Sequence, residues 1–305
     1  MQSQTFYSNG KLLLTGEYVV LDSAKALAVP TRYGQNLIVS KGSLRQIKWT
    51  SFDADKSIWF QDTITFEAIK NKTIDAKNEE IKNTLLEILH QAHTQNPNFL
   101  DGEGYTVETH LSFPRAWGLG TSSTLINNIG QWLQIDAFEL LSKSFGGSGY
   151  DIACAKTNSP IIYHLENETP HFKTVNFNPQ FKENIHFIYL NQKQSSKSAI
   201  SNYVTQRHKV APVLSKINTI TEQAIACLEG KSFAKLMEQH EIIMSDILEI
   251  KTVKEKLFPD FKGVIKSLGA WGGDFIMVIS KENPKNYFKE KGYATILTYE
   301  EMVLV

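Results

Sequence analysis

An α+β fold is predicted for this chain of 305 residues, and three observations lead to it. Segments that alternate in the manner of strands and segments with helical spacing follow each other without a regular strand–helix order, which disfavours a doubly wound sheet. Hydrophobic residues make up 42% of the chain and charged residues 21%, so a disordered chain is excluded. The length suits one large domain or two ordinary ones.

The N-terminal third predicts mainly strands. Leu12 and its neighbours lead into a tight turn at Thr15-Gly16-Glu17, and further β-branched or alternating runs follow. The predicted strands are 12–14, 18–21, 26–29, 36–40, 46–50, 58–60 and 105–111. One helix is predicted over 81–93, where leucines and isoleucines recur at helical spacing.

The centre of the chain predicts helices between two glycine-rich turns, at 117–120 and 146–149. Strands and helices then continue in mixed order, with no internal repeat and the weakest join at 176–184. The predicted helices are 121–134, 136–144, 198–205, 211–229, 233–250 and 258–267. The predicted strands are 159–165, 185–190 and 275–280.

Charge and cysteine content exclude several classes of protein. The chain has 32 Lys+Arg and 32 Asp+Glu, which disfavours a general binder of nucleic acids or anionic membranes. Cys154 and Cys227 form no CxxC pair, so a disulfide framework or a cysteine-based zinc site is not expected. With no secretory signal pattern and no long apolar run, we expect a soluble, cytoplasmic protein without a membrane span.

Charge is nevertheless segregated along the sequence. No acidic residue lies between Glu183 and Glu222, or from Ser23 to Phe52, whereas 53–108 contains eleven acids. The two acid-free stretches contain Lys193, Lys197, Arg207, Lys209 and Lys216, and Lys25, Arg32, Lys41, Arg45 and Lys48. These residues form either solvated basic faces or a positive pocket for an anionic substrate.

The strongest local signal is Pro114-Arg-Ala-Trp-Gly-Leu-Gly-Thr-Ser-Ser-Thr, which precedes a predicted helix. Its glycines allow the backbone to approach a ligand, and the free N–H groups where the helix begins favour a phosphate. A hydroxyl beside them can ligate Mg²⁺. The alternative is an ordinary Ser/Thr-capped helix after a glycine turn. The spacing matches neither a P-loop nor a dinucleotide-binding loop, and the protein-kinase motifs are absent from the sequence.

Three glycine-bearing segments, at the start, middle and end of the chain, together resemble the motifs of the GHMP kinase superfamily. They are Ser8-Asn-Gly-Lys-Leu-Leu-Leu-Thr-Gly-Glu-Tyr18, the segment 114–124, and Lys266-Ser-Leu-Gly-Ala-Trp-Gly-Gly-Asp274. A fourth stretch, Gly147-Ser-Gly-Tyr-Asp151, is similar to the S-G-x-D stretch of the mevalonate branch of that family. The departures are Asn9 for the family's proline, Ser123-Thr124 for a small pair, and Trp271 where many members have glycine.

The resemblance implies a role for each matched residue. Asp151 would be the catalytic base, and Lys11 would lie close to it and offset charge on the transferred phosphoryl group. ATP would be bound by Gly118, Leu119, Gly120, Thr121, Ser122 and Ser123. The acceptor would be bound by Glu17, Lys193, Ser196, Lys197, Gly269, Ala270, Trp271 and Gly272. Mg²⁺ would be ligated by Ser122 and Glu139, although Glu139 is equally compatible with a solvated helix position.

The resemblance also implies a two-lobed architecture and a reaction. The N-terminal, ATP-binding lobe would span 1–180, and a ferredoxin-like C-terminal lobe would span 181–305. The expected reaction is transfer of the γ-phosphate of Mg·ATP to phosphomevalonate or mevalonate. Phosphomevalonate is favoured, because an acid-free stretch suits a doubly anionic acceptor. A sugar or homoserine kinase and a catalytically silent protein that binds ATP or a metabolite are the alternatives, and a homodimer is left open.

Overall fold

The computed structural model describes residues 3–73, 80–193, 196–269, 271 and 273–304. The chain forms two compact units. Unit 1 consists of Met1–Gly10, Tyr33–Arg115 and Leu119–Lys156, and unit 2 of Lys11–Arg32, Ala116–Gly118 and Thr157–Val305. This division differs from the predicted boundary at residue 180, because two long strands, β1 (Gln4–Thr15) and β2 (Ala26–Lys41), contribute residues to both units.

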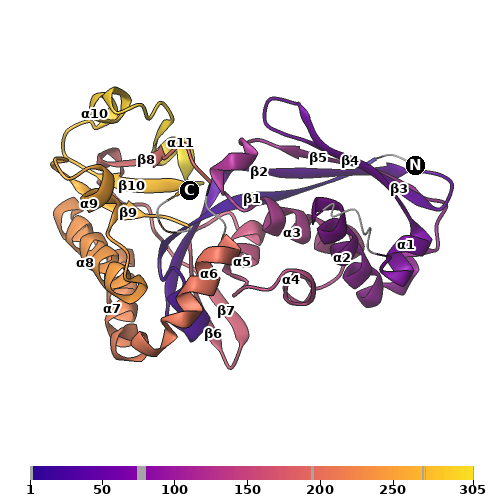
Figure 1. Cartoon of the computed structure of the whole chain (residues 1–305), viewed down its shortest axis with the longest axis horizontal. Helices are drawn as coiled ribbons and strands as arrows, with labels where there is room; N and C mark the ends of the chain where they lie inside the picture. Colours follow the sequence, from indigo (N-terminus) through magenta and orange to yellow (C-terminus); the bar gives the residue numbers. More distant parts are fainter. Residues whose placement is uncertain (1–2, 74–79, 194–195, 270, 272, 305) are drawn as a thin grey trace. The chain divides into compact units, whose positions relative to one another are not determined.

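Unit 1 has strands in the order β4-β3-β5-β2, with β1 paired to β2. Strands β3 (Gln46–Phe52) and β4 (Ile58–Thr65) form a hairpin, and β5 (Tyr105–Leu111) lies parallel to β3. Its helices gather on one face of this sheet (Figure 1). They are α1 (Phe66–Asn71), α2 (Glu80–Gln95), α3 (Thr121–Leu133), α4 (Ala137–Ser144) and α5 (Tyr150–Lys156), with a short 3-10 helix at Pro97–Leu100. Another 3-10 helix, Arg115–Trp117, begins at the last residue of the second part of unit 1 and continues into unit 2.

Helix α3 is joined to the sheet of unit 1 by buried polar side chains as well as apolar packing. Ser8 on β1 donates to Asn128 Oδ1 at 2.7 Å and accepts from Asn127 Nδ2 at 2.8 Å. The Thr124 hydroxyl donates to Gln35 Oε1 on β2 at 2.9 Å. Because a buried polar group is costly without a partner, these bonds fix how α3 lies on the sheet.

In unit 2, the first part of β2 pairs with β6 (Ile161–Glu166), which forms a hairpin with β7 (Thr169–Thr174). A separate four-stranded sheet has the order β11-β8-β10-β9. Its strands are β8 (Ile185–Tyr189), β9 (Val264–Ser267), β10 (Phe275–Ile279) and β11 (Ile296–Thr298).

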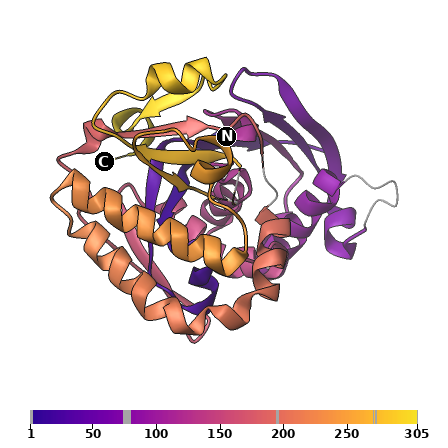
Figure 2. The same cartoon turned by 60° about the vertical axis from the view of Figure 1, so that its left-hand side comes forward.

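Helices of unit 2 pack on this sheet and on each other. The long helices α7 (Leu214–Ile225) and α8 (Gly230–Leu248) lie side by side in both views, and α8 contacts β9 (Figures 1 and 2). The others are α6 (Ser196–Thr205), α9 (Val253–Leu257), α10 (Lys285–Glu290) and α11 (Tyr299–Met302), with 3-10 helices at Val19–Asp22, Lys182–Asn184, Arg207–Lys209 and Ala211–Val213.

Most predicted elements are confirmed, and three predictions are wrong. The strands predicted separately at 26–29 and 36–40 are one continuous strand, β2. Residues 18–21 do not form a strand: Val19–Asp22 is a 3-10 helix that follows Tyr18 at a φ of 61°. Residues 258–267 do not form a helix, because Pro259 and Gly263 interrupt the run and Val264–Ser267 pairs with β10. The sequence could not distinguish a helix from a strand there, because three of the four residues of β9 are buried. A strand that is buried on both faces lacks the alternation of apolar and polar residues that identifies a half-buried strand. The helices α1, α5, α9, α10 and α11 and the strands β7 and β11 were not predicted.

Two composition-based predictions can be compared with the structure. Both cysteines are free thiols, Cys154 buried and Cys227 half-buried. Within the described residues, no helix combines the length and the apolar character that crossing a membrane requires.

Candidate functional site

The N-terminus of α3 forms one part of the candidate site. Gly120 is its N-cap, at a φ of 98°. Because glycine has no side chain, no side-chain hydrogen bond caps the first N–H groups of the helix. Thr121 and Ser122 are half-buried, whereas the Ser123 hydroxyl bonds back to the Gly120 carbonyl at 2.9 Å. Leu119 is fully buried, so only its backbone is available to a ligand. Unpaired N–H groups and the helix dipole suit a phosphate here.

Within unit 2, the three glycine-bearing segments meet at Gly118. Lys11 Nζ donates to the Gly118 carbonyl oxygen at 3.2 Å. A Cβ built on Gly118 would lie 2.4 Å from Asp274 Oδ2, and one on Gly269 would lie 3.3 Å from the same atom. The Asp274 carboxylate therefore packs against the second segment and the third at once, and Gly118, at a φ of 68°, has no room for a side chain. The sequence pattern assigned no role to Asp274.

Asp151 lies in the first turn of α5, after the glycine turn in which Gly147 and Gly149 both have positive φ. It is half-buried, and its Oδ1 accepts the Ile152 N–H at 3.1 Å. Helix α5 packs on α3 within unit 1. A carboxylate in this position can accept a proton from a bound hydroxyl group. Its predicted closeness to Lys11 stays a prediction, because the two residues belong to different units.

The residues predicted to bind metal differ in their surroundings. Glu139 is exposed in the first turn of α4, and Lys143 donates to its Oε1 at 2.5 Å. Ser122, in the first turn of α3, is a hydroxyl beside the N–H groups described above. No group of three His, Cys, Asp or Glu side chains that could hold a metal is found in the described part of the chain. Mg²⁺ needs only one or two protein ligands beside phosphates, so Ser122 fits such a site better than Glu139.

Several predicted acceptor-binding residues are only partly described. Lys193 is exposed in the loop after β8, and the backbone of Ser196 and Lys197 begins α6. The side chains of Ser196 and Lys197, and all of Ala270 and Gly272, lie outside the described residues. Trp271 is described, and its side chain is 9% exposed.

Glu17 is buried in a charged network of unit 2, which we call the Glu17 network: Glu17, His240, Glu241, Lys266 and Ser267. Lys266 Nζ contacts Glu17 Oε1 at 2.5 Å and Glu241 Oε2 at 3.6 Å. Ser267 donates through its hydroxyl to Glu241 Oε1 at 2.7 Å, and its N–H to Oε2 at 3.0 Å. All five residues are at most 3% exposed, so the carboxylate of Glu17 holds Lys266 in place rather than lining an open pocket.

His240 connects this network to the turn of the first segment. Its Nε2 accepts the Gly16 N–H at 2.8 Å, so this nitrogen carries no proton. Burial, followed by the charge of Lys266, lowers the pKa of His240 well below its ordinary value of 6.5. His240 is therefore neutral in the folded protein at pH 7.

A dependence of stability on pH is expected from His240. Below its unfolded pKa of 6.5 only the unfolded chain takes up a proton there, so the stabilisation present above pH 6.5 is lost as pH falls. His240→Gln keeps a hydrogen-bond acceptor but does not titrate. Between pH 8 and 5.5 the wild type should lose about 1.4 kcal/mol of unfolding free energy more than the variant. Urea titrations of both proteins measure this, and equal losses would contradict it. Burial raises the pKa of Glu17 and of Glu241, so their protonation adds to the free energy of unfolding as pH falls. This effect is present in the wild type and in the variant alike.

Three cations of the acid-free stretches pair with acids from elsewhere in unit 2. Lys25 pairs with Glu222, and Lys209 with Glu249. Arg207 Nε lies 2.5 Å from Asp22 Oδ1. The absence of nearby acids in the sequence therefore does not leave these three cations as an uncompensated positive surface.

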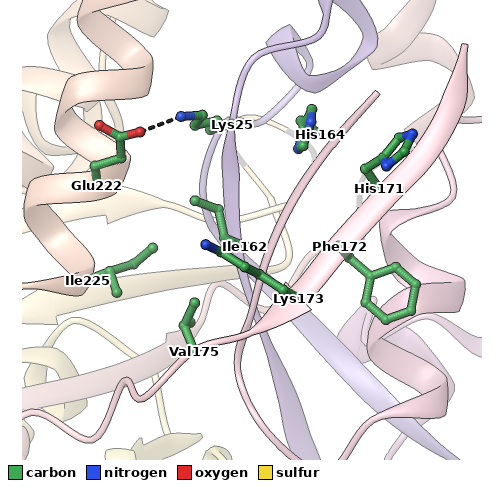
Figure 3. Close-up of a pocket in the computed structure, with 9 residues that line it drawn as sticks. All are labelled: Lys25, Ile162, His164, His171, Phe172, Lys173, Val175, Glu222 and Ile225. Carbon is green, nitrogen blue, oxygen red and sulfur yellow. Dashed lines mark hydrogen bonds and ion pairs between the residues drawn. The ribbon is translucent and has the colours of Figure 1, made fainter. Parts of the chain in front are cut away.

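A pocket of about 510 Å³ lies beside the β6–β7 hairpin, between it and α7 (Figure 3). Its charged residues include Lys25, which is paired with Glu222, and Lys173, which lies beside Ile162. The rings of His164 and His171, which also line the pocket, stack on each other. No residue of the three glycine-bearing segments lines it, so this pocket is not the site assembled around Gly118.

Comparisons with known proteins identify the fold. No protein-family model and no curated protein sequence matches the chain. The mevalonate kinase of Methanococcus jannaschii superposes with a TM-score of 0.71 at 15% identity, covering 100% of this chain and 99% of that one. Streptococcus pneumoniae phosphomevalonate kinase, in complex with phosphomevalonate and AMPPNP, gives 0.70 at 13%, covering 97% and 99%. Lactococcus lactis galactokinase, complexed with galactose, gives 0.68 at 11%, covering 100% and 95%.

These likenesses confirm the predicted fold class. The chain has the α+β fold of the GHMP kinases, and the likeness extends over its whole length. The mevalonate kinase, the phosphomevalonate kinase and the galactokinase superpose about equally well. At 11–16% identity the comparison therefore does not select an acceptor.

Proposed function

We propose that this chain is an ATP-dependent kinase of the GHMP superfamily that phosphorylates a small anionic metabolite, with phosphomevalonate or mevalonate as acceptor. The fold supports a phosphotransferase of this type. The observation on which the proposal depends is the meeting of the three glycine-bearing segments in unit 2, where Lys11 bonds to Gly118 and Asp274 packs against Gly118 and Gly269. A fold alone does not require these contacts, whereas a phosphoryl-transfer site needs such a group of close backbone turns and a cation.

In the proposed reaction, the phosphates of ATP bind the N–H groups at the start of α3, from Gly120 to Ser123. Lys11 offsets negative charge on the transferred group. Mg²⁺, when bound, would neutralise charge on the phosphates, with Ser122 as its protein ligand. Asp151 takes the proton of an attacking hydroxyl group, or orients an attacking phosphate oxygen. The bond from the γ-phosphorus to the bridging oxygen breaks, a bond to the acceptor oxygen forms, and ADP leaves.

Fewer cations favour phosphomevalonate over mevalonate in the structure than in the sequence alone. Lys25, Arg207 and Lys209 are paired with acids and no longer argue for a doubly anionic acceptor. Lys193, exposed in the loop before α6, still does. We retain phosphomevalonate as the first candidate and mevalonate as the second.

A panel of acceptors tests the proposal. ADP release from Mg·ATP is coupled to NADH oxidation with phosphomevalonate, mevalonate, galactose and homoserine at equal concentrations. Turnover with phosphomevalonate or mevalonate, and not with the other two, is expected. Efficient turnover of galactose or homoserine alone would exclude the mevalonate branch. If AMPPNP raises the melting temperature but no acceptor stimulates ADP release, the chain is instead a silent nucleotide-binding protein.

A further inference from the structure

The segment 116–118 immediately precedes the proposed phosphate-binding residues in the sequence, and side chains of unit 2 hold it in place. The Tyr189 hydroxyl on β8 donates to the carbonyl oxygen of Ala116 at 3.1 Å. The ring of Trp117 meets that of Phe275 on β10 edge-on, with centroids 5.4 Å apart and an angle of 88° between the planes. Two of the three residues are therefore fixed to the four-stranded sheet.

The third residue of the segment, Gly118, contacts the side chains of Asp274 and Lys11. The Asp274 carboxylate occupies the space that a side chain on Gly118 would need, since a Cβ there would lie 2.4 Å from Oδ2. The carbonyl oxygen of Gly118 accepts a hydrogen bond from Lys11 Nζ at 3.2 Å. The carboxylate therefore limits where the Gly118 turn can lie, and that turn in turn provides a hydrogen-bond partner for the lysine ammonium.

Asp274 itself is held in an unfavourable backbone conformation. Its φ is 52°, in the left-handed region that is unfavourable for residues other than glycine, and it is only 6% exposed. Two backbone hydrogen bonds to the chain at and after the end of β8 maintain this conformation: the Asp274 N–H donates to the Gln192 carbonyl oxygen, and the Leu190 N–H donates to the Asp274 carbonyl oxygen, both at 2.9 Å. Backbone strain that the surrounding structure maintains is concentrated at functional sites, so Asp274 is a candidate for a role in the reaction.

We propose that Asp274 is a positioning residue for phosphoryl transfer: its carboxylate fixes the Gly118 turn, and through the Gly118 carbonyl it fixes the ammonium group of Lys11. The inference rests on the proposed function, in which Lys11 offsets negative charge on the transferred phosphoryl group. Position matters for such a group, because a misplacement of about 1 Å can lower a rate about 10²-fold. Asp274 acts through Gly118 and needs no contact with a substrate.

Asp274→Gly removes the carboxylate and relieves the backbone strain, because glycine adopts a positive φ readily. The kcat is expected to fall at least about tenfold, whereas the KM for ATP changes less than about twofold and thermal unfolding stays cooperative. Asp274→Asn keeps the shape of the side chain, and asparagine tolerates this φ, so its kcat should lie within about threefold of the wild type. An Asp274→Asn protein as slow as Asp274→Gly would overturn the inference, because the contact with Gly118 depends on that shape.

Glu168→Gly is the matched control for Asp274→Gly. Glu168 is also an acidic residue of unit 2 with a left-handed backbone, at a φ of 64°, and it is exposed in the turn between β6 and β7. Its replacement removes a carboxylate and relieves strain in the same way, but far along the sequence from the glycine-bearing segments. The control should keep the wild-type kcat.

A double-variant cycle tests whether Asp274 acts through Lys11. In a Lys11→Met protein the ammonium group is already absent, so adding Asp274→Gly should lower kcat by less than about twofold. In the wild-type background the same change is expected to lower it at least about tenfold. Equal fold-losses in the two backgrounds would indicate a general structural defect and overturn the inference.

A spectrum of the protein without substrate reports on the Gly118 turn directly. Trp–Gly occurs in the sequence only at 117–118 and 271–272, so ¹³C-carbonyl tryptophan combined with ¹⁵N-glycine selects two amide signals. The signal that remains in Trp271→Phe belongs to Gly118. It should shift in Asp274→Gly and keep its wild-type position in Glu168→Gly. An unchanged Gly118 signal in Asp274→Gly would contradict the inference whatever the kinetics.

The outcomes separate this inference from the proposed function. If the wild type phosphorylates an acceptor and Asp274→Gly keeps the wild-type kcat, the inference is overturned and the kinase proposal stands. If the Gly118 signal shifts in Asp274→Gly but no acceptor stimulates ADP release by the wild type, the hold of Asp274 on Gly118 is upheld and the kinase proposal fails.

Discussion

Replacing Lys266 with methionine is expected to lower the free energy of unfolding by about 3–5 kcal/mol, the usual effect of removing one partner from a buried ion pair. Lys266 is fully buried, and its ammonium contacts Glu17 and Glu241 and donates to the Ser267 carbonyl at 2.7 Å. Without it, two buried carboxylates face each other with no cation. Urea denaturation at pH 7.5 measures the loss.

The double variant Glu17→Gln, Lys266→Met distinguishes charge from packing. Because it removes a carboxylate along with the cation, it should regain a large part of the stability that Lys266→Met loses. Lys182→Met is the surface control: its pair with Glu300, at 2.7 Å, is exposed and should contribute less than about 1 kcal/mol. Equal losses in Lys266→Met and Lys182→Met would show that the Glu17 network does not stabilise the fold.

Asp151→Asn is expected to reduce kcat by about 10²–10⁴-fold, the range usual for a general base. The amide has the same size and can still accept the Ile152 N–H through its oxygen, so folding should be preserved. The KM for ATP should change little, because the proposed phosphate contacts are at α3. The coupled ADP assay and a thermal melt measure both parts of this result.

Asp136→Asn is the matched control for Asp151→Asn. Asp136 is the N-cap of α4, where its Oδ1 accepts the Phe138 N–H at 2.8 Å, and asparagine caps a helix equally well. The control should keep full activity. An Asp151→Asn protein with wild-type turnover would exclude Asp151 as the base without excluding the kinase proposal, since other groups can orient an acceptor.

Local features of the site could be predicted from the sequence because they depend on neighbouring residues. Gly120 followed by hydroxyl residues and apolar spacing predicts the start of α3, and the structure begins that helix at Thr121. The turn before Asp151 follows from its glycines in the same way. Helix α5, which follows this turn, was not predicted, because its seven residues, Tyr150–Lys156, are too few to show a clear helical periodicity.

The contacts that organise unit 2 could not be predicted, because they join residues more than 100 positions apart. Nothing near Lys11 indicates that its ammonium bonds to Gly118, and nothing near Gly16 indicates His240 as its acceptor. The motif resemblance predicted that Glu17 binds the acceptor, and in the structure its carboxylate pairs with Lys266. Whether a charged residue of a motif meets a ligand or another side chain is decided by tertiary packing, which the neighbouring sequence does not reveal.

The long sequence separation within the Glu17 network has a consequence for how the protein is made. Glu17 is synthesised 249 positions before its partner Lys266. The segment Lys11–Arg32 belongs to unit 2, whose other main part begins only at Thr157. During translation the Glu17 carboxylate has no partner until the residues up to Lys266 have been synthesised. The Glu17 network, and with it unit 2, therefore cannot complete its folding before Lys266 has left the ribosome.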